Sequence, residues 1–205
     1  MRRGKPATDL RLLARTQLPL DTASLARSLI GKILVRETSE GLVSGRIVET
    51  EAYPVDDHAG HAYRGKTARN RSLFLSRGHA YVYLVYGTSY MLNVASEIAG
   101  VGAGVLIRAL EPMDGMPIMA RNRGTNDLYQ LARGPGRLAK AFEIDLDLDG
   151  TDLCRNGPLW LASDNQHPVE LGNSVRIGIS RGAELLLRFY VRGNPFVSGP
   201  SALNR

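Results

Sequence analysis

The 205 residues are enough for one hydrophobic core of ordinary size, so we expect a single domain. With 26 Lys and Arg against 20 Asp and Glu, the formal net charge is +6, which favours an anionic partner. The single cysteine excludes an internal disulfide and a cysteine-based zinc site, and a reducing cytoplasm is expected. The apolar runs are too short to cross a bilayer, so neither export nor membrane insertion is expected.

The N-terminal segment is basic and lacks a regular apolar pattern. We expect residues 1–19 to form a loosely held arm and residues 20–205 to form the domain. Asp21 or Thr22 can cap a short helix that continues through Leu29, because a side-chain oxygen at a helix start accepts a hydrogen bond from a free backbone N–H.

Strand patterns dominate the first half of the domain. Lys32–Glu37 and Val43–Thr50 alternate as two paired strands. Pro54–Lys66 is rich in Asp, His and Gly and is expected to be an irregular loop, followed by a short helix over Thr67–Ser76. A β-hairpin around Tyr86-Gly87-Thr88 is expected next, with two strands: Ala80–Tyr86 and Ser89–Ala95.

Helices and strands continue to mix in the second half. The pattern predicts helices over Asp114–Arg123 and Pro135–Phe142. It also predicts four strands: Gly102–Leu110, Leu159–Ala162, Ser174–Ile179 and Leu187–Val191. Because the elements do not alternate as in βαβ units, we predict an α+β fold in one mixed domain.

The densest group of polar side chains lies around the end of the second predicted strand. On a strand, Glu49, Glu51 and Tyr53 share one face because side chains alternate. A carboxylate at a strand end beside an irregular loop can act as a general base that accepts a proton from water. A solvated strand face is the alternative interpretation of the same residues.

The same region leaves a metal-dependent nuclease open as an alternative. Such an enzyme could use Glu49, Glu51, Asp56 and His61. No zincin-type motif accompanies these residues, so we expect no metal ion and no cofactor.

Tyrosines form a second cluster in the predicted hairpin. Tyr81 and Tyr83 share one strand face, where tyrosine is usually half-buried in packing. Tyr86 lies beside Gly87 at the tip, which cannot bury it within its own domain. An aromatic residue in this place can wedge into a base stack, as in minor-groove binders.

Basic residues form two candidate surfaces for phosphate. The sequence RGPGR opens a predicted helix, whose free N–H groups and two arginines suit a phosphate, so Arg133, Gly136 and Arg137 are expected contacts. Arg69 and Arg71 belong to a second basic stretch that could follow a nucleic-acid backbone. An ordinary turn and a solvated helix face remain the alternatives.

Seven segments carry the most specific signal: GRIVETEAY (45–53), RNRSLF (69–74), YVYLVYG (81–87), LNV (92–94), LIRALEP (106–112), GPGRLAKAF (134–142) and RFYVRGNPFVS (188–198). Together and in this order, they resemble the alkyladenine (3-methyladenine) DNA glycosylase family found in mammals and many bacteria. The resemblance implies one compact mixed domain with a curved antiparallel sheet, surrounding helices and a protruding β-hairpin that inserts into DNA.

The resemblance also implies an activity. A glycosylase of this kind flips an alkylated or deaminated purine out of duplex DNA and hydrolyses its N-glycosidic bond, which leaves an abasic site. The substrates implied are 3-methyladenine, 7-methylguanine, hypoxanthine and etheno-adenine. By its match to the family motifs, Glu51 corresponds to the general base, and Arg108 corresponds to the arginine that helps to position the water and the carboxylate.

The remaining matched residues surround the flipped base. Tyr53, His61 and Tyr83 correspond to the aromatic walls that sandwich it. Asn93 corresponds to the asparagine that crowds the exocyclic amino group of guanine, and Tyr86 corresponds to the hairpin-tip residue that fills the gap in the stack. Compared with mammalian members, the loop before His61 is slightly shorter, the tip beyond the tyrosine is smaller, and residues 142–171 are shortened.

A non-catalytic nucleic-acid-binding module of the same fold is another alternative. It would keep Tyr86 and the arginine surface but would not need Glu51 and Arg108 together. A lysine nucleophile would make the enzyme a lyase, but the four lysines lie outside the Glu51 cluster, so hydrolysis is favoured. We expect a monomer that acts on damaged double-stranded DNA and, in a bacterium, associates with the nucleoid.

Overall fold

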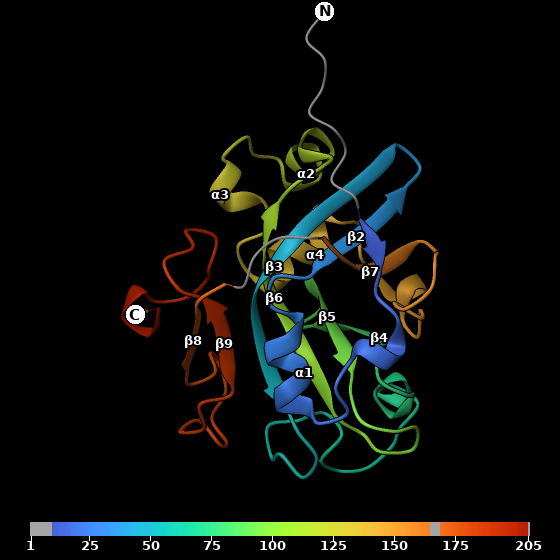
Figure 1. The fold of residues 1–205 in the computed structure, drawn as a ribbon. Coiled ribbons are helices and arrows are strands. Elements are labelled where there is room, and N and C mark those ends of the chain that lie inside the picture. The colour runs from blue at the N-terminus through green and yellow to red at the C-terminus, as the bar shows by residue number, and fades with distance from the viewer. Residues whose placement is uncertain (1–9, 165–168, 205) are drawn as a thin grey trace, which may run out of the picture.

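The long strand β3, Gly41–Tyr53, organises the sheet of this protein. The computed structural model describes residues 10–164 and 169–204, and in this part the strands follow the order β1-β7-β2-β3-β6-β5-β4, all antiparallel (Figure 1). One edge of β3 pairs with β2 over Gly41–Arg46 and then with β9 over Glu49–Glu51. Its other edge pairs with β6, with a bulge around Glu49.

The elements have the following bounds: β1 (Arg11–Leu12), α1 (Thr22–Leu29), β2 (Ile33–Thr38), β3 (Gly41–Tyr53), β4 (Ala80–Val85), β5 (Ser89–Ala95), β6 (Gly104–Pro112), α2 (Met116–Arg123), α3 (Leu128–Leu131), α4 (Pro135–Ala141), β7 (Leu159–Ser163), β8 (Leu171–Ser174) and β9 (Arg188–Val191). Short 3₁₀ turns add Arg15–Gln17, Arg71–Phe74, Leu146–Leu148 and Ser201–Leu203. The predicted α+β class with a curved antiparallel sheet is confirmed.

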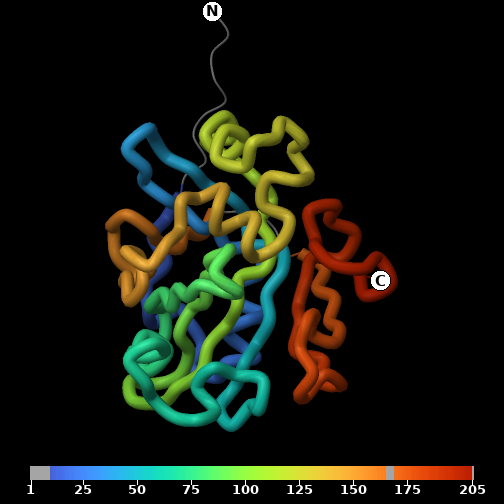
Figure 2. Tube along the Cα trace, turned by 180° about the vertical axis from the view of Figure 1, so that it is seen from behind, coloured from blue at the N-terminus to red at the C-terminus, as the bar shows by residue number. Residues whose placement is uncertain are grey.

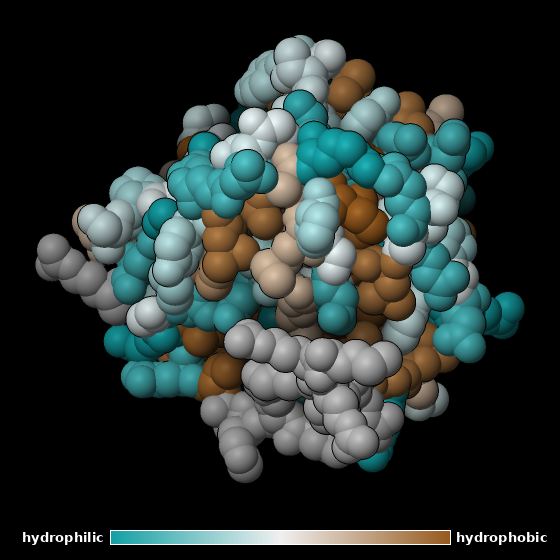
Figure 3. Space-filling view, turned by 90° about the horizontal axis from the view of Figure 1, so that it is seen from above, coloured by the Kyte–Doolittle hydropathy of each residue, from teal (hydrophilic) through white to brown (hydrophobic). Residues whose placement is uncertain are grey.

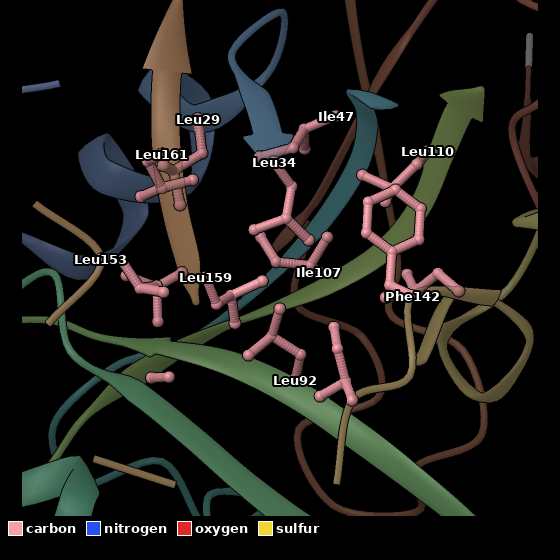
Figure 4. Packing of buried hydrophobic residues seen from close by; sticks show 14 of the residues in the cluster. Leu29, Leu34, Ile47, Leu92, Ile107, Leu110, Phe142, Leu153, Leu159 and Leu161 are labelled. Atoms are coloured by element: carbon pink, nitrogen blue, oxygen red, sulfur yellow. The ribbon is translucent and has the colours of Figure 1, made fainter. Parts of the chain in front are cut away.

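The main core fills the curl of the sheet. Leu29 of α1 and Phe142 after α4 meet side chains from the inner strands, among them Ile47, Leu92 and Ile107 (Figure 4). Each fully buried side chain of this size contributes about 1.5–3 kcal/mol. The two helices are seen best from opposite sides of the molecule, α1 in Figure 1 and α4 in Figure 2.

Helix α1 forms as its sequence predicts. The Asp21 carboxylate accepts a hydrogen bond from the Ser24 N–H at 2.7 Å, and Gly31 follows the helix end with a φ of 82°. The face that carries Leu25 and Leu29 is buried, so the cap and the apolar stripe act together.

The prediction of a loosely held N-terminal arm is wrong for residues 10–19. Arg11–Leu12 pairs with β7, and Leu13 and Leu18 are buried in the main core. Arg15 fixes the segment further through an ion pair with Asp152 at 2.6 Å. Apolar residues spaced within a basic segment therefore hold it on the domain; residues 1–9 lie outside the described residues.

Two further predictions differ from the structure. Thr67–Ser76 is mostly irregular because the Asn70 side chain accepts from the Thr67 N–H at 2.6 Å and donates to the His61 carbonyl at 2.8 Å, and such bonds compete with a helix. The prediction of a strand over Ser174–Ile179 is also wrong, because the observed strand β8 ends at Ser174. The Ile177 N–H leaves the sheet to bind a carboxylate of β3.

The β4–β5 hairpin extends past the sheet. β5 pairs with β6 only over Asn93–Ala95, whereas β4 and β5 continue to pair out to Val85 and Ser89. The outer edge of β4 is covered near its base, where the Val82 N–H donates to Asp149 at 3.0 Å. This arrangement leaves the tip of the hairpin free and its base fixed.

Hydrophobic and hydrophilic side chains mix on the face seen from above, with brown groups set among teal ones (Figure 3). Within residues 10–164 and 169–204, every helix is too short or too polar to cross a membrane.

Candidate active site

A row of buried charges crosses β6, β3 and β9. The Glu49 carboxylate accepts from Arg108 Nε at 2.8 Å and from Arg188 Nε at 2.7 Å, and its second oxygen accepts from the Ser198 N–H at 2.7 Å. Arg108 also reaches Glu51, with Nη1 3.2 Å from Oε1. Two carboxylates and two guanidinium groups therefore balance one another in the interior.

Burial alone would raise the pKa of Glu49. The charges of Arg108 and Arg188, together with hydrogen bonds from Ser198 and Arg188, outweigh burial and hold that pKa below its ordinary value. For Arg108, burial would lower the pKa, but Glu51 and Glu49 raise it. Glu49 and Arg108 are therefore charged at neutral pH.

Glu51 lies fully buried beside this network. Its Oε1 accepts from the Ile177 N–H at 2.7 Å, and its Oε2 accepts from the Tyr53 hydroxyl at 2.9 Å. The predicted shared face of Glu49, Glu51 and Tyr53 is confirmed by these contacts. Since a carboxylate offers about four acceptor positions, the three donors around Glu51, counting Arg108, leave room for one more.

A cavity of about 340 Å³ opens next to Glu51. Its volume is in the range of sites for small organic ligands. Glu51 itself does not line it, but three of its contacts, Tyr53, Arg108 and Ile177, do. The structure brings the other predicted base-binding residues, His61, Tyr83 and Asn93, to the same cavity, and Tyr86, predicted to intercalate into DNA, also lines it.

Aromatic rings form one side of the cavity. The Tyr81 and Tyr83 rings stack at 5.1 Å, and His61 meets Tyr83 edge-on at 4.4 Å. His61 Nδ1 also lies 3.0 Å from the Tyr81 hydroxyl. Burial, and then the charge of Arg69, lower the pKa of His61, so its ring is neutral at neutral pH.

Asn93 lies on β5 opposite Leu106 of β6, at the point where the hairpin leaves the sheet. Its Nδ2 is buried and makes no hydrogen bond of ordinary geometry within the described residues, although the Asn93 side chain is close enough to the Tyr83 hydroxyl to act against the rise of its pKa. An unpaired buried donor costs about 1–3 kcal/mol. A ligand that places a hydrogen-bond acceptor next to Nδ2 would remove this cost.

Tyr86 is 96% exposed at the hairpin tip. Tyr86 and Gly87 have φ values of 50° and 70°, and the Thr88 N–H donates to the Val85 carbonyl at 3.0 Å. Positive φ at two successive positions is typical of the tightest hairpin turns. A non-glycine residue in this conformation costs about 1–3 kcal/mol, and residues strained in this way are often found at functional sites.

The predicted phosphate contacts lie on both sides of the hairpin. Arg69 Nη2 donates to the Leu84 carbonyl at 3.1 Å, and Arg71 lies near it on the outer side of β4. Arg133 is partly committed to the Val197 carbonyl at 2.8 Å, and Arg137 contacts Gln130.

Gly136 has a packing role that the sequence did not reveal. A Cβ at Gly136 would lie 3.1 Å from that of Ser89, so the glycine lets the start of α4 approach the hairpin. A groove of about 880 Å³ runs between them, and three basic side chains are among those that line it: Arg123, Arg137 and Lys140.

The sequence patterns do not single out two buried arginines, Arg176 and Arg188. Arg188 lies in a predicted strand at a fully buried position, and a charge within the apolar run RFYV was the signal. Arg176 pairs with both oxygens of Asp57. Asp57 and Glu49 therefore bind arginine, and no three His, Cys, Asp or Glu residues of the described ranges form a metal-ion group.

The chain matches the family model described as methylpurine-DNA glycosylase (MPG) over residues 16–195. The chain belongs to this family. Membership makes it a DNA glycosylase, a hydrolase of the N-glycosidic bond that acts in DNA repair.

Curated relatives agree with the family assignment. A Mesorhizobium japonicum protein assigned as a 3-methyladenine DNA glycosylase is 69% identical over 191 residues, which cover 93% of this chain and 92% of that protein. Proteins with the same assignment from Paraburkholderia phytofirmans and Methanoculleus marisnigri are 51% and 46% identical, over 93% and 87% of this chain and 90% and 94% of their own lengths.

Replacement of Glu49 by glutamine should destabilise this DNA glycosylase by about 3–5 kcal/mol, because two buried guanidinium groups lose their shared charge. Urea unfolding at pH 7 measures the change. The lowered pKa adds a pH dependence: the Glu49 contribution is fully present above its ordinary pKa of 4.5 and is lost as pH falls through the lowered value. The variant should therefore lose less stability than the parent in that acid range.

Glu40→Gln is the matched control, because Glu40 forms an exposed ion pair with Arg121. Exposed pairs contribute about 0–1 kcal/mol. A Glu49→Gln effect no larger than that of Glu40→Gln would show that the buried network does not stabilise the fold.

Proposed function

We propose that this chain flips damaged purines from duplex DNA into the 340 Å³ cavity and hydrolyses the bond between base and sugar. The observation that carries the proposal is the juxtaposition of three features: an aromatic cavity, the buried Glu51–Arg108 pair behind it, and the exposed Tyr86 at its rim. Flipping is needed because the reacting atoms are inaccessible within a base stack.

The cavity suits a purine by its volume and by the aromatic rings that line it. Tyr53, His61 and Tyr83 offer ring faces and edges to a flat base. A purine methylated at N3 or N7 carries positive charge and gains from the tyrosine ring quadrupoles. Neutral lesions such as hypoxanthine and etheno-adenine would be held by stacking and by hydrogen bonds.

Glu51 acts as the general base in this proposal. A water that takes the remaining acceptor position of its carboxylate attacks C1′ of the sugar. The bond between C1′ and the base nitrogen breaks, the electron pair leaves with the base, and Glu51 takes the proton of the water. A cationic methylpurine thereby leaves as a neutral base, whereas hypoxanthine leaves as an anion and takes a proton from solvent. Arg108 contacts Glu51 at 3.2 Å and lines the cavity, so it can orient the carboxylate and the water.

Hydrolysis is favoured over lyase chemistry by the placement of the lysines. Lys32, Lys66 and Lys140 are described by the structure, and none of the three lines the cavity. A Schiff base would need an amine within reach of C1′.

The DNA backbone would pass on both sides of Tyr86. Arg137, with Arg123 and Lys140, lies in the groove between α4 and the hairpin, and Arg69 and Arg71 lie beyond β4. Gly136 lines the same groove, and Arg133 lies two residues before α4. These cations would bind phosphates, and binding to undamaged DNA depends on such contacts.

Glu51→Gln should reduce single-turnover release of hypoxanthine or 7-methylguanine from a duplex by about 10²–10⁴-fold, because the amide keeps the shape but cannot accept the proton. Binding to lesion DNA should change little. The assay contains EDTA and uses hot alkali to reveal abasic sites, and Glu37→Gln, on β2, serves as a control. Retention of more than about a tenth of the rate would contradict the general-base role, and a parent enzyme silent in EDTA but active with a divalent ion would favour the nuclease alternative.

Tyr86→Ser should leave the melting temperature nearly unchanged, because the side chain buries almost no area. It should reduce excision from duplex DNA by lowering the flipped fraction, and the defect should shrink opposite a gap, where extrusion costs less. Stopped-flow fluorescence of etheno-adenine reports flipping. Tyr129→Ser, at another exposed tyrosine, is the control; a Tyr86 variant that flips as fully as the parent would remove the wedge role.

Asn93→Ser should relax discrimination against normal guanine. The Asn93 Nδ2 group is a hydrogen-bond donor without a partner. The exocyclic amino group of guanine is also a donor, so the two groups would meet without an acceptor between them. An unmatched donor costs about 1–3 kcal/mol. The ratio of guanine release to hypoxanthine release should therefore rise by about tenfold or more, as measured by abasic sites in single-lesion duplexes. An unchanged ratio would place the obstacle to guanine elsewhere in the cavity.

A further inference from the structure

Arg176 lies behind the cavity and joins three segments of its wall. Its guanidinium is buried and pairs with Asp57 in the loop after β3, with Nη2 3.2 Å from Oδ1. Nη1 donates to the Ala52 carbonyl of β3 at 2.9 Å, and Nη2 donates to the Gly182 carbonyl at 3.3 Å. A single side chain thus fixes the end of β3 and both loops that flank it.

The same guanidinium lies against Tyr53. Its Cζ is 4.6 Å from the centroid of the Tyr53 ring. Tyr53 lines the cavity, so the ring that Arg176 contacts is also part of the ligand site. The next residue, Ile177, lines the cavity and donates its N–H to Glu51. Arg176 therefore contacts a cavity wall directly and holds the backbone that binds Glu51.

The charge of Arg176 reaches the ring despite its pairing with Asp57. Burial and the Glu51 carboxylate raise the pKa of Tyr53, whereas Arg176 acts in the opposite direction. A ring that already binds one cation attracts a second cation less, because the two positive charges repel each other through the ring. Water in the interior is too scarce to screen this repulsion fully.

We infer that Arg176 is a positioning residue for Tyr53 that also lowers the preference of the cavity for positively charged purines over neutral ones. The inference rests on the proposed function, since it requires the flipped base to contact Tyr53. A cavity with the same tyrosine and histidine walls and the same Arg108, but without a cation on the Tyr53 ring, would select charged lesions more strongly. With Arg176 in place, one cavity accepts both classes.

The test compares a duplex with 7-methylguanine, which is cationic, with a duplex with hypoxanthine, which is neutral. Single-turnover titrations give the half-saturating enzyme concentration and the maximal rate for each. The first variant, Arg176→Gln with Asp57→Asn, removes both charges and keeps two planar groups that can hydrogen-bond. The second variant, Asp57→Asn alone, leaves the cation without its counter-charge.

The two variants should shift the lesion preference in opposite directions. The neutral pair should favour 7-methylguanine over hypoxanthine by about three- to tenfold more than the parent, as measured by the ratio of half-saturating concentrations. Asp57→Asn alone should shift that ratio towards hypoxanthine. A purely structural role would weaken both lesions together and could not reverse the sign.

The matched control is Arg46→Gln with Asp164→Asn, because Arg46 of β3 and Asp164 after β7 also form a largely buried pair, with Nη2 2.6 Å from Oδ2, and neither residue lines the cavity. It should leave the lesion ratio unchanged. Unchanged ratios in both test variants would overturn the inference, as would failure of both to fold while the control folds, since Arg176 would then be a structural residue. A parent enzyme that releases neither base would instead refute the proposed function.

Discussion

The Glu49 carboxylate, buried between two guanidinium groups, is the interaction on which the rest of the site depends. It joins β3 to β6 through Arg108 and to β9 through Arg188. The bulge in β3 lies at this residue, where the ladder with β6 changes register, and bulges commonly redirect side chains beside active sites. A charge that would be unstable alone thereby sets the place of Arg108, and Arg108 in turn sets the place of Glu51.

The loops in the wall of the cavity are also held by buried polar side chains. Irregular loops have few ladder hydrogen bonds to hold them, and here a buried ion pair and an amide side chain replace those bonds. Asp57–Arg176 fixes the loops on one side, and Asn70 fixes the loop that presents His61. A buried ion pair that also makes hydrogen bonds restrains the loops that it joins. In this part of the cavity wall, side-chain contacts therefore take the place of a strand ladder.

Local signals in the sequence were enough for the elements whose hydrogen bonds are local. Asp21 caps α1, and the Tyr86-Gly87 turn closes the hairpin as predicted. The errors arose where a side chain far along the chain decides the backbone, as when Ile177 leaves the sheet to bind Glu51. Arg176 and its partner Asp57 are 119 residues apart, so no periodicity could connect them. The match of Glu51 and Arg108 came from family motifs rather than from spacing.

The long reach of the Glu49 network has a consequence for the order of folding. The hydrogen bonds of Glu49 to Arg188 and Ser198 span 139 and 149 residues. Contacts of such separation form late, because the chain between them must be closed first. During synthesis β2 and β3 can pair early, but the Glu49 carboxylate stays without two of its donors until the C-terminal strands emerge. The sheet is therefore assembled before the buried charge network is complete, since a nascent chain that ends before β9 lacks both Arg188 and Ser198 as donors to Glu49.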